Sequence, residues 1–328
     1  MADLQSVAAF APASVGNASV GFDTLGFALE SPGDWVRIES SDEPGVQMRQ
    51  ARFQEELAAD DYMDKALPLD AQSNVAGFAA LRMWEACDPD QRPAGLKVDL
   101  LKGMGIGTGM GSSAASAAAA VKAASEILRR DFSESELIRF GLEAEALASG
   151  GIHGDNLIPS LIGGFVGIRS HEPLDYFSLP VPQELTCCLL HPRVRVLTSE
   201  AREALPVQIP LSSGISQWAN VGSLVAGLYE SDYERIGRSL KDHVAAPVRS
   251  AFIPGYELLE KIAVEAGALG FGISGSGPSV FALCRGEESC SAIAEAWTEA
   301  YPVQEVDFRI YKSRVASKGA RITEMGKL

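Results

Sequence analysis

The chain has 328 residues, and its 28 Lys and Arg against 43 Asp and Glu give a formal net charge of −15. This length exceeds what one hydrophobic core usually accommodates and predicts two domains. The acidic balance disfavours a nucleic-acid or anionic-membrane surface, which needs clustered basic side chains. No apolar run could span a membrane, the N-terminus lacks a secretory pattern, and the five cysteines form no CxxC pair. We therefore expect a cytoplasmic protein without disulfides.

Strand-like and helix-like segments alternate along the chain, which predicts an α+β fold. The first half suggests strands near 5–10, 34–40, 95–101 and 163–169, and helices over 74–86, from about Ser112, and over 134–149. Ser133 and Glu136 form a capping box at the start of the third helix. The second half suggests strands near 185–190, 269–274, 278–284 and 304–311, and helices near 199–205, 215–229, 255–266 and 287–300. We place the two domains at 1–168 and 169–328.

A glycine-dense loop at 103–111 leads into an alanine-rich helix. Glycines leave out Cβ atoms, so the backbone can approach an anion and point its N–H groups at it. The helix N-terminus at Ser112 and Ser113 adds unpaired amides and a favourable dipole. Neither G-x-G-x-x-G nor G-x-x-x-x-G-K-[ST] fits the loop, which argues against two common nucleotide-binding fingerprints. The sequence thus predicts a phosphate site of another kind.

Three stretches together resemble the GHMP kinases, in that family's order and spacing: the glycine loop, 11–17 and 272–279. The resemblance covers essentially the whole chain. It implies an N-terminal domain like the second domain of ribosomal protein S5, a ferredoxin-like C-terminal domain, and the use of ATP and Mg²⁺. It implies that the nucleotide contacts are Asn74, Lys102, Gly105, Gly107, Gly109, Met110, Gly111, Ser112 and Ser113.

Other stretches resemble the homoserine kinases within that family, namely 16–26, 149–156, 198–202 and 247–254. The resemblance implies ATP-dependent phosphorylation of the side-chain hydroxyl of L-homoserine, a step of threonine biosynthesis. A carboxylate, an ammonium and a hydroxyl need a cationic fork, an acid and a polar group, which the implied residues supply. The implied substrate residues are Asn17, Asp23, His153, Thr198, Arg202, Arg249 and Gly275.

Glu145 lies on the apolar face of its predicted helix, where a carboxylate is costly unless it is paired or bound to a metal. The resemblance makes Glu145 and Ser113 magnesium ligands. It makes Asp155 and Asn156 the catalytic candidates, either with Asp155 as a general base or with Asn156 orienting the hydroxyl. The sequence leaves both open.

Structural roles also stay open for several candidates. Asp23 could form an Asx-turn, His153 could be a structural histidine, and Arg249 and Lys102 could be solvated. Rival functions are a GHMP kinase acting on another small alcohol, an inactive ligand-sensing homologue, and a dehydrogenase, which the absent fingerprint disfavours. We expect a homodimer, with no nucleic-acid or membrane partner.

Overall fold

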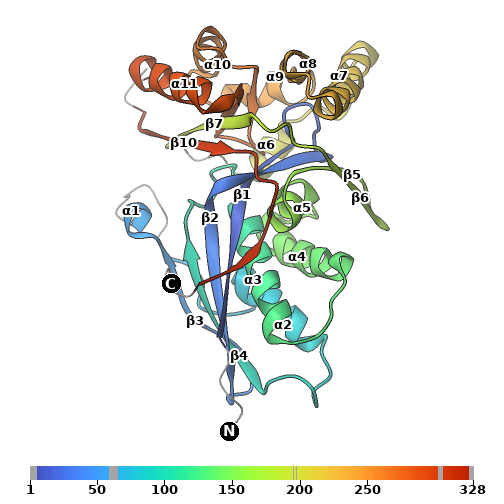
Figure 1. Ribbon diagram of the computed structural model, residues 1–328, viewed down its shortest axis with the longest axis vertical. Coiled ribbons are helices and arrows are strands. Elements are labelled where there is room, and N and C mark those ends of the chain that lie inside the picture. Colours follow the sequence, from blue (N-terminus) through green and yellow to red (C-terminus); the bar gives the residue numbers. More distant parts are fainter. Residues whose placement is uncertain (1–5, 59–65, 195, 197, 302–305, 325–328) are drawn as a thin grey trace.

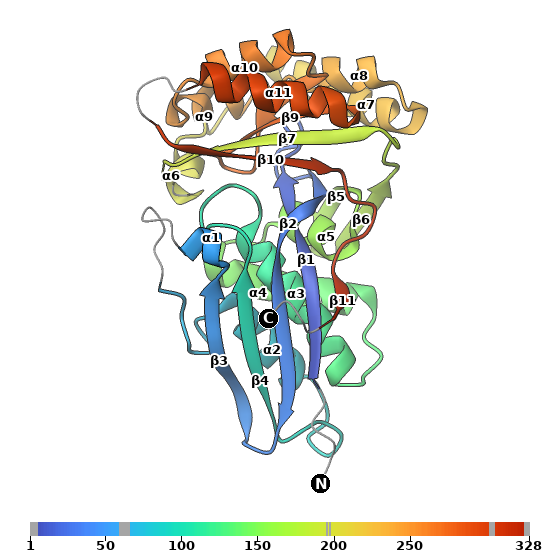
Figure 2. The ribbon, with the colours of Figure 1, turned by 60° about the vertical axis from the view of Figure 1, so that its left-hand side comes forward.

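Two β-sheets organise the protein, as Figures 1 and 2 show. The computed structural model describes residues 6–58, 66–194, 196, 198–301 and 306–324. A seven-stranded sheet occupies the lower half of both views, and a four-stranded sheet crosses above it. Helices cover one face of each sheet, so the predicted α+β class agrees with the structure.

The seven-stranded sheet has the order β11-β1-β2-β4-β3, with β5 pairing with β2 and β6 with β5. The β3–β4 pair is parallel and the other pairs are antiparallel. Its strands are β1 (Ser6–Gly16), β2 (Leu25–Ser41), β3 (Gly45–Phe53), β4 (Gly95–Lys102), β5 (Phe165–His171), β6 (Leu174–Leu179) and β11 (Arg321–Thr323).

The smaller sheet is antiparallel, with the order β10-β7-β9-β8. Its strands are β7 (Leu185–Pro192), β8 (Gly270–Ile273), β9 (Val280–Arg285) and β10 (Phe308–Arg314). The helices of the described residues are α1 (Glu55–Ala58), α2 (Val75–Glu85), α3 (Ser112–Ile127), α4 (Glu134–Ser149), α5 (Gly154–Ile162), α6 (Thr198–Glu203), α7 (Leu211–Glu230), α8 (Tyr233–Ser239), α9 (Ala246–Arg249), the short 3-10 helix η1 (Ser250–Phe252), α10 (Tyr256–Glu265) and α11 (Gly286–Ala300).

Helix α3 is central to the N-terminal half because its side chains are small. Each of its alanines is 0% exposed, and the helix contacts β1 and β2 on one side and α2, α4 and α5 on the others. Side chains of this size let a helix lie close to a sheet with few voids. The packing fixes where the N-terminus of α3 emerges, directly after the glycine loop.

Helix α4 has the end signals that the sequence predicts. Ser133 Oγ accepts the Glu136 N–H, and the Glu136 carboxylate accepts the Ser133 N–H, which completes the capping box. Gly150 ends the helix in the left-handed conformation, with φ 71°. Both ends are therefore set locally.

The division between the sheets falls later than the predicted boundary at 168/169. Strand β6 pairs with β5 and so belongs to the larger sheet, and the next strand, β7, starts the smaller one. Near the C-terminus the chain returns to the larger sheet, because β11 pairs with β1. The larger sheet therefore includes strands from both sides of any single boundary in the sequence.

Several elements differ from the predicted ones. Strand β1 runs on to Gly16, beyond the predicted strand near 5–10, because residues 11–16 also pair with β2 despite their glycine and serine content. Strands β3, β6 and β11 and helices α1, α5, α8 and α9 have no predicted counterpart. None of these elements is longer than nine residues, and patterns over so few residues give only a weak local signal.

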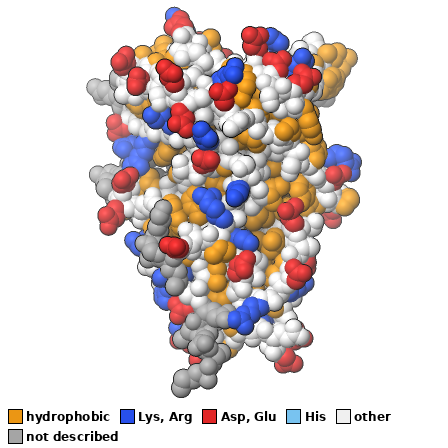
Figure 3. All heavy atoms as spheres, in the orientation of Figure 1, with side chains coloured by type: hydrophobic (Ala, Val, Ile, Leu, Met, Phe, Trp, Pro, Cys, Tyr) orange, Lys and Arg blue, Asp and Glu red, His pale blue; other side chains and the backbone are white. Residues whose placement is uncertain are grey.

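Acidic and basic side chains are mixed over the face shown in Figure 3.

Helix α7 carries exposed apolar side chains, among them Leu211, Ile215 and Trp218. The predicted homodimer stays a prediction, for which this helix offers an apolar face. Across the described residues, every helix is too short or too polar to cross a membrane.

Candidate active site

A cavity of about 810 Å³ opens where the two halves meet. The glycine loop, the first turn of α3, α4, the start of α5 and the loop between β1 and β2 supply its walls from the N-terminal half. Helix α6, Arg249 and the turn at Gly275 supply them from the C-terminal half. Sixteen of the predicted site residues line it: Asn17, Asp23, Asn74, Lys102, Gly107, Gly109, Gly111, Ser112, Ser113, Glu145, His153, Asp155, Asn156, Arg202, Arg249 and Gly275.

The glycine loop is clamped by the second half of the protein. Ser274 Oγ donates to the Gly109 carbonyl (2.7 Å), and Ser279 Oγ donates to the Thr108 carbonyl (2.5 Å). Both serines belong to the predicted 272–279 motif, so that motif fixes the loop from the opposite domain. Ser112 Oγ is buried and has no hydrogen-bond partner among the described residues, which suits a polar ligand at the helix N-terminus.

Gly111 lets the loop reach the catalytic candidates. Its φ is 65°, and a Cβ there would lie 2.2 Å from Ser14 Oγ and 2.9 Å from Asn156 Oδ1. Only glycine fits both the conformation and the close approach. Met110 does not line the cavity, because its side chain is fully buried in the core, and Gly105 also lies outside the lining.

Ser113 and Glu145 form a pair in the cavity wall, with Ser113 Oγ donating to Glu145 Oε1 at 3.0 Å. Burial raises the pKa of Glu145 to about 7, because a charged carboxylate is poorly solvated there. A hydroxyl and a carboxylate beside a phosphate site fit Mg²⁺, which takes one or two protein ligands and keeps several waters. The described residues hold no cluster of three His, Cys, Asp or Glu suited to a metal, so an ion here would depend on the nucleotide for further ligands.

Asp155 and Asn156 begin α5 and face the loop between β1 and β2. Asp155 Oδ2 accepts the Asn17 N–H (2.8 Å), and Asn156 Oδ1 accepts Ser14 Oγ–H (3.1 Å). Burial, and next to it the charge of Asp23, raises the pKa of Asp155 to about 6. Asp155 is therefore a carboxylate that takes up and releases a proton near neutral pH.

The loop between β1 and β2 is held in an uncommon backbone conformation. Asn17, Ala18, Ser19 and Asp23 have φ values of 65°, 40°, 63° and 56°, each costing on the order of 1–3 kcal/mol. Asn17 compensates through its side chain, which donates to the Gly275 carbonyl (2.7 Å) and accepts the Asp23 N–H (2.9 Å). Strain of this kind concentrates at functional loops.

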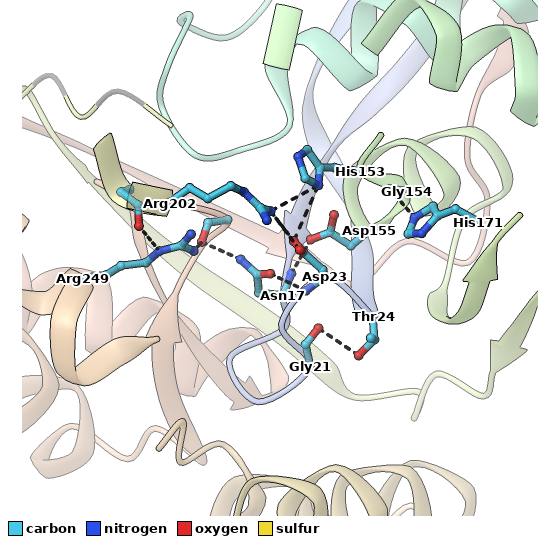
Figure 4. A network of polar contacts seen from close by, with 12 residues as sticks. Asn17, Gly21, Asp23, Thr24, His153, Gly154, Asp155, His171, Arg202 and Arg249 are labelled. Atoms are coloured by element: carbon cyan, nitrogen blue, oxygen red, sulfur yellow. Dashed lines mark hydrogen bonds and ion pairs between the residues drawn. The ribbon is translucent and has the colours of Figure 1, made fainter. Parts of the chain in front are cut away.

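Two arginines from the second half converge on this loop, as Figure 4 shows. One nitrogen of Arg202 donates to both carboxylate oxygens of Asp23 at 2.9 Å and lies 3.3 Å from His153 Nδ1. Burial lowers the pKa of His153, which favours a neutral ring. Arg249 is 3% exposed and donates to the carbonyls of Ala201 (3.2 Å) and Gly275 (3.1 Å).

Phe22 joins the two arginines and is a residue that the sequence did not single out. The guanidinium carbon of Arg202 lies 5.5 Å from the centre of the Phe22 ring, and that of Arg249 lies 5.0 Å from it. Contacts of this length are attractive for a cation over an aromatic face. The signal was its position directly before Asp23, in a loop that was already expected to bind substrate.

Three predicted residues need separate description. Asn74 lines the cavity, but its side chain also caps α2 by accepting the N–H groups of Ala76 and Gly77. Lys102 lines the cavity with its ammonium bound to protein acceptors. Thr198 begins α6, and its side chain lies outside the described part of the chain.

Apolar residues from separate segments complete the cavity, and no local pattern predicted their shared position because they are far apart along the chain. They include Leu67, Val75, Leu100, Ile106 and Leu147. Ile106 and Leu147 are 57% and 45% exposed, so they present apolar surface to a ligand such as a flat aromatic base.

Comparison with known proteins identifies the fold. The family model for the N-terminal domain of GHMP kinases matches residues 74–164, and the model for their C-terminal domain matches 224–303. A mevalonate kinase from L. major shares the fold at 15% identity, with a TM-score of 0.69 over 95% of this chain and 97% of that one. Together these matches define a GHMP-type kinase, an enzyme class that phosphorylates an alcohol with ATP.

More similar proteins narrow the assignment. A homoserine kinase from Chlorobium phaeobacteroides is 40% identical over 97% of this chain and 100% of its own. The homoserine kinase of Arabidopsis thaliana is 39% identical over 90% of this chain and 78% of its own. The crystal structure of the Cytophaga hutchinsonii homoserine kinase superposes with a TM-score of 0.89, at 41% identity over 98% of this chain and 99% of that one. The chain belongs to the homoserine kinases of the GHMP family, so the predicted family and two-domain fold are confirmed.

Proposed function

We propose that the protein transfers the γ-phosphoryl group of ATP to the side-chain hydroxyl of L-homoserine, giving O-phospho-L-homoserine. The relatives described above carry the name homoserine kinase. One observation carries the proposal for this chain: a single cavity has a phosphate-type loop on one side and an Asp23, Arg202 and Arg249 cluster on the other. Asn156 lies against Gly111 of the loop, and Asp155 is bonded to Asn17 beside the cluster.

The glycine loop and the first turn of α3 receive the ATP phosphates in this proposal. Gly107, Gly109 and Gly111 give close access to backbone N–H groups, and the helix dipole favours negative charge. The apolar side chains near Asn74 face the base. Little covalent chemistry is needed, because phosphoryl transfer depends on positioning and on neutralising charge.

Magnesium belongs to the proposal, with Ser113 and Glu145 as the residues that would hold it. When bound, the ion would neutralise charge on the phosphates during transfer. Glu145 contributes a buried carboxyl group in the cavity wall. The hydroxyl of Ser113 beside it can turn either toward Glu145 or toward a ligand. Since burial favours the protonated acid, a cation is the natural partner for the ionised form.

The zwitterion of homoserine matches the charges of the cluster. Arg202 and Asp23 neutralise each other in the free protein. The substrate ammonium would face Asp23 and its carboxylate the two guanidinium groups, so each protein charge keeps an opposite partner. Asp155 accepts the hydroxyl proton in this proposal, because a base with a pKa near 6 is ionised yet still basic at neutral pH.

A substrate panel tests the function. Purified protein with ATP and Mg²⁺ is offered L-homoserine, L-homoserinol, mevalonate or galactose, and ADP release is followed. We expect turnover with L-homoserine to exceed that with the others by at least about tenfold in kcat/KM, since loss of one charged partner costs about tenfold to a hundredfold. Faster turnover of mevalonate or galactose would instead support another GHMP activity.

A further inference from the structure

A buried ion pair lies behind the glycine loop, on residues that the proposed chemistry does not use directly. Asp34 on β2 is 0% exposed and Lys102 at the end of β4 is 3% exposed. Lys102 Nζ lies 2.5 Å from Asp34 Oδ2. The two strands are antiparallel neighbours, and the preceding pair in the ladder is Trp35 with Leu101. A charged pair with this little exposure stays buried only if its hydrogen bonds are met.

Every hydrogen of the Lys102 ammonium has an acceptor in the protein. Besides Asp34, the acceptors of Lys102 Nζ are the Ser112 carbonyl at 3.1 Å and Ser116 Oγ at 2.8 Å. An ammonium has three donors and no acceptor. A phosphate oxygen could bind Lys102 directly only by displacing one of these buried partners, which would leave that partner unsatisfied.

The pair touches both ends of the glycine loop. At the start, the Gly103 N–H donates to Asp34 Oδ1 (3.0 Å). At the end, Lys102 holds the Ser112 carbonyl, and Ser116 Oγ donates to Asp34 Oδ2 (2.6 Å). Ser112 and Ser116 form the first turn of α3, where the proposed phosphate site lies. One carboxylate and one ammonium thus fix the distance between the base of the loop and the helix N-terminus.

We propose that Asp34 and Lys102 are positioning residues that hold the glycine loop in its phosphate-receiving shape, and that Lys102 is not a nucleotide ligand. This rests on the proposed function only in that the loop receives ATP. The anchor itself is a property of the free protein. It replaces the sequence-based prediction that Lys102 contacts the nucleotide.

Hydrogen exchange in the nucleotide-free protein tests the anchor. The variants are Asp34→Asn, Lys102→Met and the double variant. The double variant leaves no unpaired buried charge, so its melting temperature should be higher than that of either single variant. The control is Lys97→Met on the same strand, whose lysine pairs with Glu43 at the surface. In all three anchor variants, amides of residues 103–116 should exchange at least about tenfold faster than in wild type, as for loss of a charge-assisted hydrogen bond. The control should match wild type. Unchanged exchange in the double variant would overturn the proposal.

ATP affinity separates positioning from direct binding. If the pair positions the loop, Asp34→Asn and Lys102→Met should each weaken ATP binding by a similar factor of about ten. The double variant should then bind ATP no more weakly than the single variant with the lower ATP affinity. If Lys102 instead binds phosphate, Lys102→Met alone weakens binding and Asp34→Asn, which frees the lysine, does not; that result contradicts the proposal. Wild type that binds no ATP would reject the proposed function, while the exchange experiment would still decide the anchor.

Discussion

Glu145 is a carboxylate whose burial would be unfavourable without a cation. The Glu145→Gln variant keeps the shape and the bond from Ser113 but removes the charge. We expect kcat at saturating Mg²⁺ to fall more than about a hundredfold, as for loss of a preorganised charge at the reacting phosphates. The melting temperature without metal should stay the same or rise, because burial already favours the uncharged acid. A kcat within about threefold of wild type would show that Glu145 holds no essential ion.

Asp155 should give both activity and stability a pH dependence. The folded protein holds the Asp155 proton up to about pH 6, whereas the unfolded chain releases it near pH 4. The stability from this proton is present below about pH 4 and is lost as pH rises through about 6. Asp155→Asn should therefore gain melting temperature relative to wild type as the pH is raised from 4 to 8.

The same variant decides the catalytic role. A general base contributes about 10²–10⁴-fold, so Asp155→Asn should lose at least that lower factor in kcat. Wild-type kcat/KM should rise with pH to a plateau above about 6, and this rise should be missing in the variant. If the variant keeps more than about a tenth of wild-type kcat, orientation of the hydroxyl by Asn156 becomes the better account.

In the proposed function, Arg202 and Arg249 recognise the substrate carboxylate. Each charge-assisted bond is worth about 1.5–3 kcal/mol, so Arg202→Ala or Arg249→Ala should raise the homoserine KM about tenfold to a hundredfold. The KM for ATP should barely change. L-Homoserinol, which lacks the carboxylate, is the control substrate, and the variants should lose little further activity toward it. Equal damage toward both substrates would mean that the arginine supports the fold, a real alternative for buried Arg249.

At the scale of elements, the glycine loop combines backbone freedom with close packing, and two of its glycines separate these effects. Gly107 has φ 71° and open space where a Cβ would lie, whereas a Cβ at Gly111 would meet Ser14 and Asn156. Gly107→Ala should cost about 1–2 kcal/mol from its φ alone. Gly111→Ala should cost more and should also lower kcat about tenfold or more by moving Asn156. Equal effects on kcat would argue against the close approach; thermal melts and steady-state kinetics measure both.

How far the sequence could predict these elements depends on how local their signals are. The capping box of α4, the glycine loop and the apolar strands of the smaller sheet are set by neighbouring residues, and they were predicted. Strand β11 and the run of β1 through Gly16 depend on pairing partners that are distant in sequence. Local periodicity therefore could not reveal them.

The candidate site shows the same contrast. Ser113, Glu145 and Asp155 could be assigned to one site from the family resemblance, and all three line the cavity. Phe22, Asp34 and the apolar lining could not, because their roles exist only once the segments meet. Lys102 was assigned by its place beside the loop, and only the fold reveals that Asp34 binds its ammonium.

At the scale of the whole molecule, the second half closes a site that the first half begins. Ser274 and Ser279 hold the glycine loop. Arg202 reaches Asp23 and Arg249 reaches Phe22, both in the loop between β1 and β2. The acidic chain, with a net charge of −15, thus gathers cationic side chains and a helix N-terminus around one cavity. The central claim is that ATP and an amino-acid alcohol meet there.

The most direct test is to identify the product. Protein, ATP, Mg²⁺ and L-homoserine are incubated, and a phosphorus–proton correlation spectrum is recorded. The account predicts ADP and a phosphate monoester whose phosphorus couples to the terminal CH₂ protons of homoserine. Glu145→Gln should form less than about a hundredth as much over the same time. ADP release without that ester, or phosphate attached to the amino or carboxyl group, would contradict the account.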